Sequence, residues 1–267
     1  IEDMYRPHYG PGRDRSVPSD YHRFLEAEGY TPDTSCEGFP AFSRRFAAGL
    51  KPEHTKPMFL AREARRFILE NRHGPFMLFV NFLEPHMPFT GPYDSRYSPD
   101  RVMLPVNFGR VPNDEPVHCR LRREYFARRG YEGLDLSEPP GWKRILGNYW
   151  GLVELVDEAV GMILDTVAQC GLEDETVVVF TSDHGDMLGD HKLLVKGAFF
   201  YEPSVKVPLI LRWPKKIPAG KRRESFVQLN DLAATVLSAA GFSKETIAGF
   251  MPESSDIISG KTEQYPI

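Results

Sequence analysis

The alternation of helical and strand-like segments is the feature that most constrains how this chain can fold. The longest helical pattern covers residues 143–170, where apolar residues recur every three or four positions and form one stripe. A β-branched segment at 175–182 follows it and is typical of a buried strand. Shorter segments of both kinds are helices predicted at 56–72 and 230–240, and strands predicted at 75–83 and 207–213. This order predicts an α/β fold with a mostly parallel sheet between helices.

Length and composition exclude several classes of protein. The chain has 267 residues, of which 41% are hydrophobic and 26% are charged, and its net charge is −4. A weakly acidic chain lacks the positive field of a protein that binds nucleic-acid backbones. No apolar run approaches the ~20 residues that span a bilayer. We therefore expect neither nucleic acid nor a membrane among its partners.

Three regions are predicted along the chain. Residues 1–55 read as an irregular, loop-rich segment with one short helix at 20–28. Residues 56–245 form part of the α/β domain, and residues 246–267 begin a C-terminal region or a linker. Within the domain, residues 85–142 are rich in proline and lack a sustained period, which predicts long functional loops.

Polar residues follow the predicted strand at 175–182, where an open α/β sheet binds its ligands. Asp183 and His184 come first, and this adjacent carboxylate and imidazole can bind one metal ion. Gly185 permits the sharp turn that would direct both side chains inward. Lys196 lies thirteen residues beyond Asp183, and its cation suits a tetrahedral oxyanion.

The predicted strand at 75–83 also leads into polar residues, in the segment EPHMPF that contains His86. Each of these features has a structural interpretation as well. An Asp-His-Gly sequence is often only a turn with a capping carboxylate, and His86 could be an exposed loop residue. Asp186 and Asp190 could be solvated or could orient the metal ligands. We favour the functional interpretation over the structural one because three segments point to the same chemistry.

Several motifs, all in the same order, resemble those of type I sulfatases in the alkaline phosphatase superfamily. The matching segments are FVNFLEPHMPF at 79–89, GLVELVDEAVG at 151–161, FTSDHGDMLGDH at 180–191 followed by Lys196, YEPSVKVPLI at 201–210, and LNDLAATVL at 229–237. The resemblance extends over about residues 56–242. It implies that the α/β fold is alkaline phosphatase-like and that this chain holds an incomplete part of the catalytic domain.

The resemblance also implies a reaction and a site. The family hydrolyses sulfuric esters, and Asp183 and His184 match two ligands of a divalent cation, which is usually calcium. Lys196 matches a lysine that contacts a sulfate oxygen. His86 matches the histidine beside the scissile ester oxygen, a donor to the leaving alcohol. The family's nucleophile is a formylglycine made from the first residue of a C/S-x-P-x-R motif.

The chain departs from the family at this nucleophile. None of Cys36, Cys119 and Cys170 begins a C-x-P-x-R motif. The near match that starts at Ser16 has Asp20 where the motif requires arginine. An Asp-Asp pair and a Gly-Lys-x-His segment, which precede the matched part in the family, are also missing. We expect the formylglycine to lie upstream of this chain, and the isolated chain to be catalytically inert.

Three functions stay open on the sequence alone. The first is a sulfatase that acts on a small sulfated substrate, a sugar, choline or aryl sulfate. The second is a phosphonate or phosphate ester hydrolase of the same superfamily, because histidine ligation suits Mn²⁺ or Zn²⁺ better than Ca²⁺. The third is an inert chain that binds a metal or a glycan. The compartment, periplasm or cytoplasm, is left open.

Overall fold

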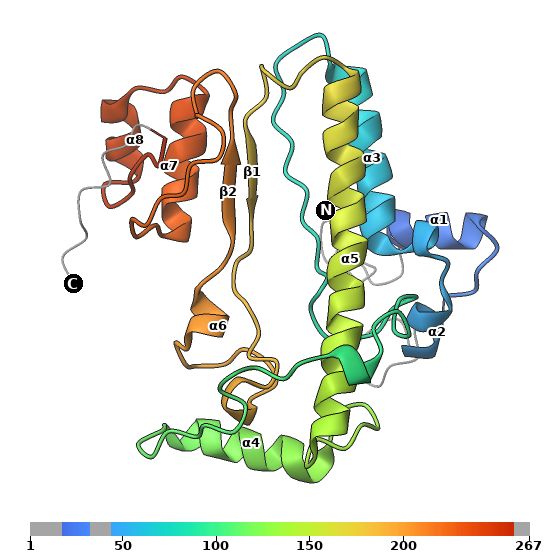
Figure 1. Ribbon diagram of the computed structural model, residues 1–267. Coiled ribbons are helices and arrows are strands. Elements are labelled where there is room, and N and C mark those ends of the chain that lie inside the picture. The colour runs from blue at the N-terminus through green and yellow to red at the C-terminus, as the bar shows by residue number, and fades with distance from the viewer. Residues whose placement is uncertain (1–17, 33–43, 259–267) are drawn as a thin grey trace. The chain divides into compact units, whose positions relative to one another are not determined.

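The structure, a computed structural model, describes residues 18–32 and 44–258, which form two compact units. The first unit comprises the described residues as far as Cys170, together with 186–199. The second unit comprises Gly171–Gly185 and the chain from Phe200 onward. Figure 1 labels the elements of both. Ser16, which begins the near match to the nucleophile motif, and Cys36 lie outside the described residues.

Two helices that run side by side form the framework of the first unit (Figure 1). Helix α3 (Lys56–Asn71) buries Ala61, Ala64 and Ile68, which belong to the apolar stripe predicted from the sequence. Helix α5 (Pro139–Gln169) begins four residues before its predicted start, because proline is accommodated in the first turn of a helix. Both helices confirm the predicted pattern.

The main hydrophobic core of the first unit lies around the start of α5. Trp142 of α5 is 2% exposed and belongs to the same cluster as Phe89 and Val195. Phe89 follows His86 by three residues, and Val195 immediately precedes Lys196. The segments that carry His86 and Lys196 are therefore anchored in one core.

Several shorter helices complete the first unit: α1 (Asp20–Ala27), α2 (Arg44–Gly49), α4 (Val117–Arg129), η1 (Pro52–His54), η2 (Pro99–Arg101) and η3 (Asp190–Lys192). Helix α1 confirms the short helix predicted at 20–28. Helix α4 lies within residues 85–142, which were predicted to be irregular. The helix was not predicted because it buries only Cys119 and so has no apolar stripe. Within residues 18–32 and 44–258, no helix combines the length and the apolarity that crossing a membrane requires.

The described residues of the second unit form a two-stranded sheet and three helices. Strand β1 (Val178–Thr181) pairs with strand β2 (Leu209–Arg212) in antiparallel register, with Val178 opposite Arg212. Both strands lie inside the segments predicted for them. The helices are α6 (Glu202–Val205), α7 (Leu229–Ala239) and α8 (Lys244–Phe250). Helix α7 confirms the helix predicted at 230–240.

The sheet differs from the expectation in two respects. Residues 75–83 are extended, with Met77 and Phe79 74% and 82% exposed and their neighbours half-buried, yet they pair with no strand of the described chain. The ladder seen within the described residues is antiparallel, whereas a mostly parallel sheet was predicted. A segment joins a sheet only where a neighbour completes its backbone hydrogen bonds, which a sequence pattern does not specify. A helix-rich chain with a small sheet is consistent with part of an α/β fold.

Candidate active site

His86 lies in a tight turn whose position is fixed by its own backbone and by α5. The His86 N–H donates to the Leu83 carbonyl at 2.9 Å, and ring atom Nδ1 lies 2.8 Å from the Met87 carbonyl oxygen. Because a carbonyl oxygen only accepts, Nδ1 carries the proton. Farther along, the Asn148 side chain donates to the Phe89 carbonyl at 3.0 Å. These contacts fix the imidazole ring in one orientation.

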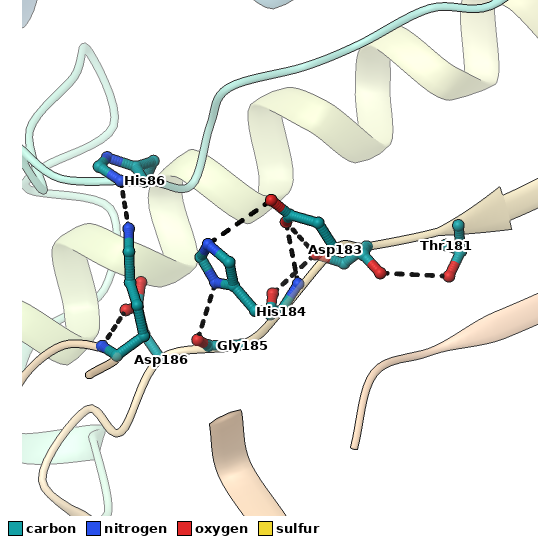
Figure 2. A network of polar contacts seen from close by, with 8 residues as sticks. His86, Thr181, Asp183, His184, Gly185 and Asp186 are labelled. Atoms are coloured by element: carbon teal, nitrogen blue, oxygen red, sulfur yellow. Dashed lines mark hydrogen bonds and ion pairs between the residues drawn. The ribbon is translucent and has the colours of Figure 1, made fainter. Parts of the chain in front are cut away.

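The ammonium group of Lys196 contacts the other ring nitrogen of His86, Nε2 (Figure 2). A lysine ammonium only donates, so Nε2 accepts and His86 is neutral in this arrangement. The structure thus brings together two of the predicted site residues that are 110 positions apart in the sequence. A cation and an imidazole at one point can bind an oxyanion and handle a proton.

Residues 186–196, here called the lysine loop, determine where Lys196 lies. The Asp186 carboxylate accepts a hydrogen bond from the Lys196 backbone N–H at 2.8 Å (Figure 2). Inside the loop, the Leu188 N–H donates to the Leu194 carbonyl at 2.9 Å. Asp186, which sequence analysis left as either solvated or orienting, therefore joins the two ends of the loop. Burial raises the pKa of Tyr149 to about 12, and the negative charge of Asp186 adds to this shift.

Two arginines of α4 hold the lysine loop from outside. Arg122 donates to the Lys196 carbonyl at 2.8 Å, and Arg123 Nε donates to the His191 carbonyl at 2.9 Å. Arg123 also donates from Nη1 to Glu115 at 2.8 Å, and this hydrogen bond holds the pKa of Glu115 below its ordinary value. Sequence analysis missed this support because α4 was not predicted.

The backbone of the lysine loop is strained. Leu188, His191 and Lys192 have positive φ angles of 43°, 51° and 55°, a conformation that costs a residue with a side chain about 1–2 kcal/mol. The buried side chains of Leu193 and Leu194, each 1% exposed, and the arginine contacts offset that cost. The loop therefore holds one conformation because its surroundings impose it.

The second predicted pair, Asp183 and His184, follows β1 in the second unit. Asp183 Oδ1 accepts from the His184 backbone N–H at 2.9 Å. His184 Nδ1 lies 3.1 Å from the Gly185 carbonyl oxygen, so it carries the proton. Nε2 lies 3.5 Å from Asp183 Oδ2 (Figure 2), and the two form an ion pair whenever His184 is protonated. A carboxylate oxygen and an imidazole nitrogen thus lie next to each other.

Gly185 has a different role from the one expected. Its φ angle is not in the left-handed region, and its N–H donates to the Ser204 carbonyl at 2.9 Å. A Cβ atom at this position would lie 2.1 Å from the Pro203 carbonyl oxygen. Glycine is needed here because α6 approaches the backbone closely, and this approach fixes the turn that carries His184.

Asp183 and His184 fit a divalent cation as part of its ligand set. The carboxylate suits Ca²⁺, and the neutral imidazole suits Mn²⁺ or Zn²⁺. The Asp183 side chain is 82% exposed and so is accessible to an ion. Within the described residues, no group of three or more His, Cys, Asp or Glu side chains forms a metal site. The two predicted pairs belong to different units, and each is described by itself.

Comparison with known proteins supplies the family. Residues 13–242 match the protein family described as Sulfatase, which is more than half of the chain. The chain belongs to the sulfatase family. This match confirms the resemblance of the motifs to type I sulfatases of the alkaline phosphatase superfamily.

Individual relatives agree with the family. The chain is 28% identical over 200 residues to the multifunctional alkaline phosphatase superfamily protein PehA of Trinickia caryophylli, which covers 71% of this chain and 38% of that protein. It is 32% identical over 177 residues to a choline-sulfatase of Rhizobium meliloti, with coverage of 65% and 33%. This sulfatase-family chain therefore spans about a third of the length of these two curated relatives.

A solved structure confirms the fold class. A phosphonate monoester hydrolase from Silicibacter pomeroyi superimposes with a TM-score of 0.69 at 19% identity. The superposition covers 94% of this sulfatase-family chain and 51% of that chain. At this identity the likeness concerns the fold alone, which is the alkaline phosphatase-like α/β fold predicted from the sequence.

Proposed function

We propose that the whole protein hydrolyses sulfate monoesters by a metal-assisted mechanism with a formylglycine nucleophile. The observation that carries the proposal is the contact between the Lys196 ammonium and His86 Nε2. Membership of the sulfatase family supports the class of reaction. A fixed cation beside an imidazole suits an ester whose sulfate is an oxyanion and whose alcohol must leave with a proton.

Lys196 and His86 would divide the work between the sulfate and the alcohol. A bound sulfate oxygen attracts the Lys196 ammonium and so releases Nε2 of His86. Nε2 then takes up a proton from solvent water, while Nδ1 keeps its own proton against the Met87 carbonyl. As the oxygen of the nucleophile bonds to sulfur and the bond between sulfur and the alcohol oxygen breaks, Nε2 transfers its proton to the alcohol oxygen, and the alcohol leaves neutral.

The remaining parts of the site rest on the resemblance and on the donor atoms. Asp183 and His184 would hold a divalent cation, which polarises the sulfate when bound. The exposed carboxylate of Asp183 and the adjacent imidazole of His184 support this role. No cysteine of this chain begins a C-x-P-x-R motif, so the formylglycine is assigned to no residue here. Mass spectrometry of peptides from the whole protein detects it directly.

Hydrolysis of a phosphonate or phosphate ester is the second candidate. The imidazole of His184 favours it, since nitrogen ligands suit Mn²⁺ or Zn²⁺ better than Ca²⁺. PehA, a relative of this chain, is named as multifunctional within the alkaline phosphatase superfamily. A serine or threonine nucleophile that needs no maturation would favour this second reaction.

An assay of the whole protein separates the two candidates. The substrates are para-nitrophenyl sulfate and para-nitrophenyl phenylphosphonate, each with added Ca²⁺ or Mn²⁺. We expect the sulfate ester to have the higher kcat/KM and the highest rate with Ca²⁺. Preferred turnover of the phosphonate with Mn²⁺ would select the second candidate. Turnover of neither ester under any metal condition would refute hydrolysis at this site.

A further inference from the structure

One face of α3 forms a groove that is rich in arginine. The volume of the groove is about 410 Å³. Its lining residues recur at three- and four-residue steps along the helix, and they are Arg62, Arg65, Arg66, Leu69 and Glu70. None of them takes part in the proposed reaction. Because three of the five are arginines, the groove presents positive charge to a ligand.

The Arg62 guanidinium is held in place by an aromatic ring of another helix. Its Cζ atom lies over the Phe24 ring of α1, 4.1 Å from the ring centre. This cation–π contact fixes the position of the charge and occupies none of the N–H groups at the edge of the guanidinium. Arg62 is also half-buried, which restricts its side chain further. The cation is therefore in place before a ligand binds.

Arg65, about one helical turn beyond Arg62, is fixed by a hydrogen bond to α5. Its Nε donates to the Thr166 hydroxyl oxygen at 3.0 Å. That hydroxyl donates its own hydrogen to the Met162 carbonyl at 2.8 Å, so its oxygen is left to accept from Arg65. A guanidinium has five N–H donors, and this contact uses one of them. The two terminal nitrogens of Arg65 keep their N–H groups for a ligand.

The carboxylates of α3 do not neutralise these two cations. Glu63 forms an ion pair with Arg66, and Glu70 lies 4.0 Å from the same guanidinium. In the part of the chain that the structure describes, no carboxylate forms an ion pair with Arg62 or Arg65. Like charges three positions apart on a helix repel each other, and a bound anion would remove that repulsion.

We propose that Arg62 and Arg65 bind a tetrahedral oxyanion such as sulfate in this groove. A carboxylate has two oxygens and fills one guanidinium fork, whereas a tetrahedral anion has oxygens for two guanidiniums with different anchors. A water molecule takes about 30 Å³, so the groove has room for the ion and part of its hydration shell. The sulfate is either the free ion or a group carried by an ester. Neither Lys196 nor His86 is involved, so the site does not depend on the proposed hydrolysis.

Phenylglyoxal, a reagent that modifies arginine, tests the site in the whole protein. Mass spectrometry of peptides gives the rate of modification at each arginine, with sodium sulfate or with sodium chloride at the same ionic strength. At about 20 mM sulfate, a site with a dissociation constant of about 5 mM should slow the reaction of Arg62 and Arg65 about fivefold. Arg72, an exposed residue directly after α3, is the matched control and should react at nearly the same rate in both salts.

Two variants show whether the fixed arginines carry the binding. Thr166→Val removes the hydroxyl that holds Arg65 but keeps both guanidiniums, and it should reduce the protection by sulfate to less than about twofold. Lys196→Ala should leave the protection of both arginines unchanged. A protein that failed to hydrolyse any ester would still show the protection, so the failure of this inference and that of the proposed function are distinguishable.

Two other anions identify the class of ligand. Protection by inorganic sulfate alone supports a site for the free ion, and protection by methyl sulfate as well supports a site for the sulfate group of an ester. Acetate that protects as well as sulfate would overturn the inference and would indicate the carboxylates of an acidic peptide. Equal slowing of Arg72, or no slowing of Arg62 and Arg65, would also overturn it. The same holds if Arg62 and Arg65 do not react without sulfate, because the groove would then be covered in the whole protein.

Discussion

Lys196 and Asp183 follow the same apolar strand within thirteen residues of each other, yet the chain holds them very differently. The Lys196 backbone is bound at its N–H by Asp186 and at its carbonyl by Arg122, and Val195 before it is in the core. The Asp183 side chain contacts its neighbours Ser182 and His184 and is 82% exposed. The first position is built by long-range contacts, and the second by local ones.

This difference teaches which part of the site the protein prepares in advance. A charged donor that is already in place costs no reorganisation when charge develops on the substrate. The Lys196–His86 pair meets that condition, because both backbones are anchored in the core of the first unit. The Asp183–His184 pair offers two donor atoms that a cation would bring to their final geometry.

The largest effect should come from removing the prepared cation. Lys196→Ala in the whole protein should lower kcat/KM for para-nitrophenyl sulfate by about 10²–10³-fold, the loss typical of one fixed donor to a developing oxyanion. Lys192→Ala is the matched control, because Lys192 is in the same loop and lies over the Phe108 ring. Similar losses in both variants would mean that the loop's shape matters and the Lys196 ammonium does not.

The affinity for a divalent cation should depend on Asp183 and His184. Asp183→Asn should weaken the binding of Ca²⁺ or Mn²⁺ to the protein by roughly 10–100-fold, as isothermal titration calorimetry would measure. Lys196→Ala should leave that affinity unchanged, because Lys196 is bound through Asp186 and Arg122 and not through Asp183. Asp174→Asn, at an exposed residue of the same unit, is the control. Equal cation affinity in the Asp183 and Asp174 variants would refute the metal assignment.

Stability should reveal how the His184 turn is held. Gly185→Ala places a Cβ 2.1 Å from the Pro203 carbonyl oxygen, which should lower the free energy of unfolding by about 1–3 kcal/mol. Gly161→Ala on α5 has open space around its Cβ, and should raise that free energy by up to about 1 kcal/mol. Urea denaturation measures both. A neutral Gly185→Ala would show that α6 does not constrain the turn.

The smallest expected effect is the pH dependence that Glu84 introduces. Its pKa is raised by burial in the folded state, so the unfolded chain loses this proton first as pH rises above 4.5. The free energy of unfolding then falls with pH, whereas below 4.5 both states are protonated and no penalty exists. Glu84→Gln removes the ionisation. Its gain in Tm over the wild type should grow as the pH rises above 4.5. A constant difference in Tm would contradict this.

The sequence predicted those elements whose apolar pattern is local. Helices α3, α5 and α7 and strands β1 and β2 fall where periodicity and β-branched residues place them. Helix α4 was missed because it buries only Cys119 and so has no stripe to detect. The antiparallel pairing of β1 with β2 was not predicted, because register and direction depend on which neighbours complete the ladder, and a single segment does not encode that.

The part of the candidate site that could be predicted from the sequence consists of polar residues that follow apolar segments. Three site residues come shortly after apolar segments of the sequence: His86, Asp183 and His184. The chemistry of these side chains could therefore be predicted from the order of the residues. The contact between Lys196 and His86 could not be predicted from the sequence, because it depends on how Asp186 and α4 hold the lysine loop.

A double-mutant cycle on His86 and Lys196 tests the central claim most directly. The claim is that Lys196 holds the sulfate so that the alcohol oxygen meets His86, and that neither side chain is effective without the other. kcat/KM for para-nitrophenyl sulfate is measured in the whole protein for His86→Ala, Lys196→Ala and the double variant. We expect the double variant to be hardly slower than the poorer single variant, because the loss of either side chain leaves the other without its effect. Additive losses in the free energy of activation would contradict it, and would show that the two residues act independently.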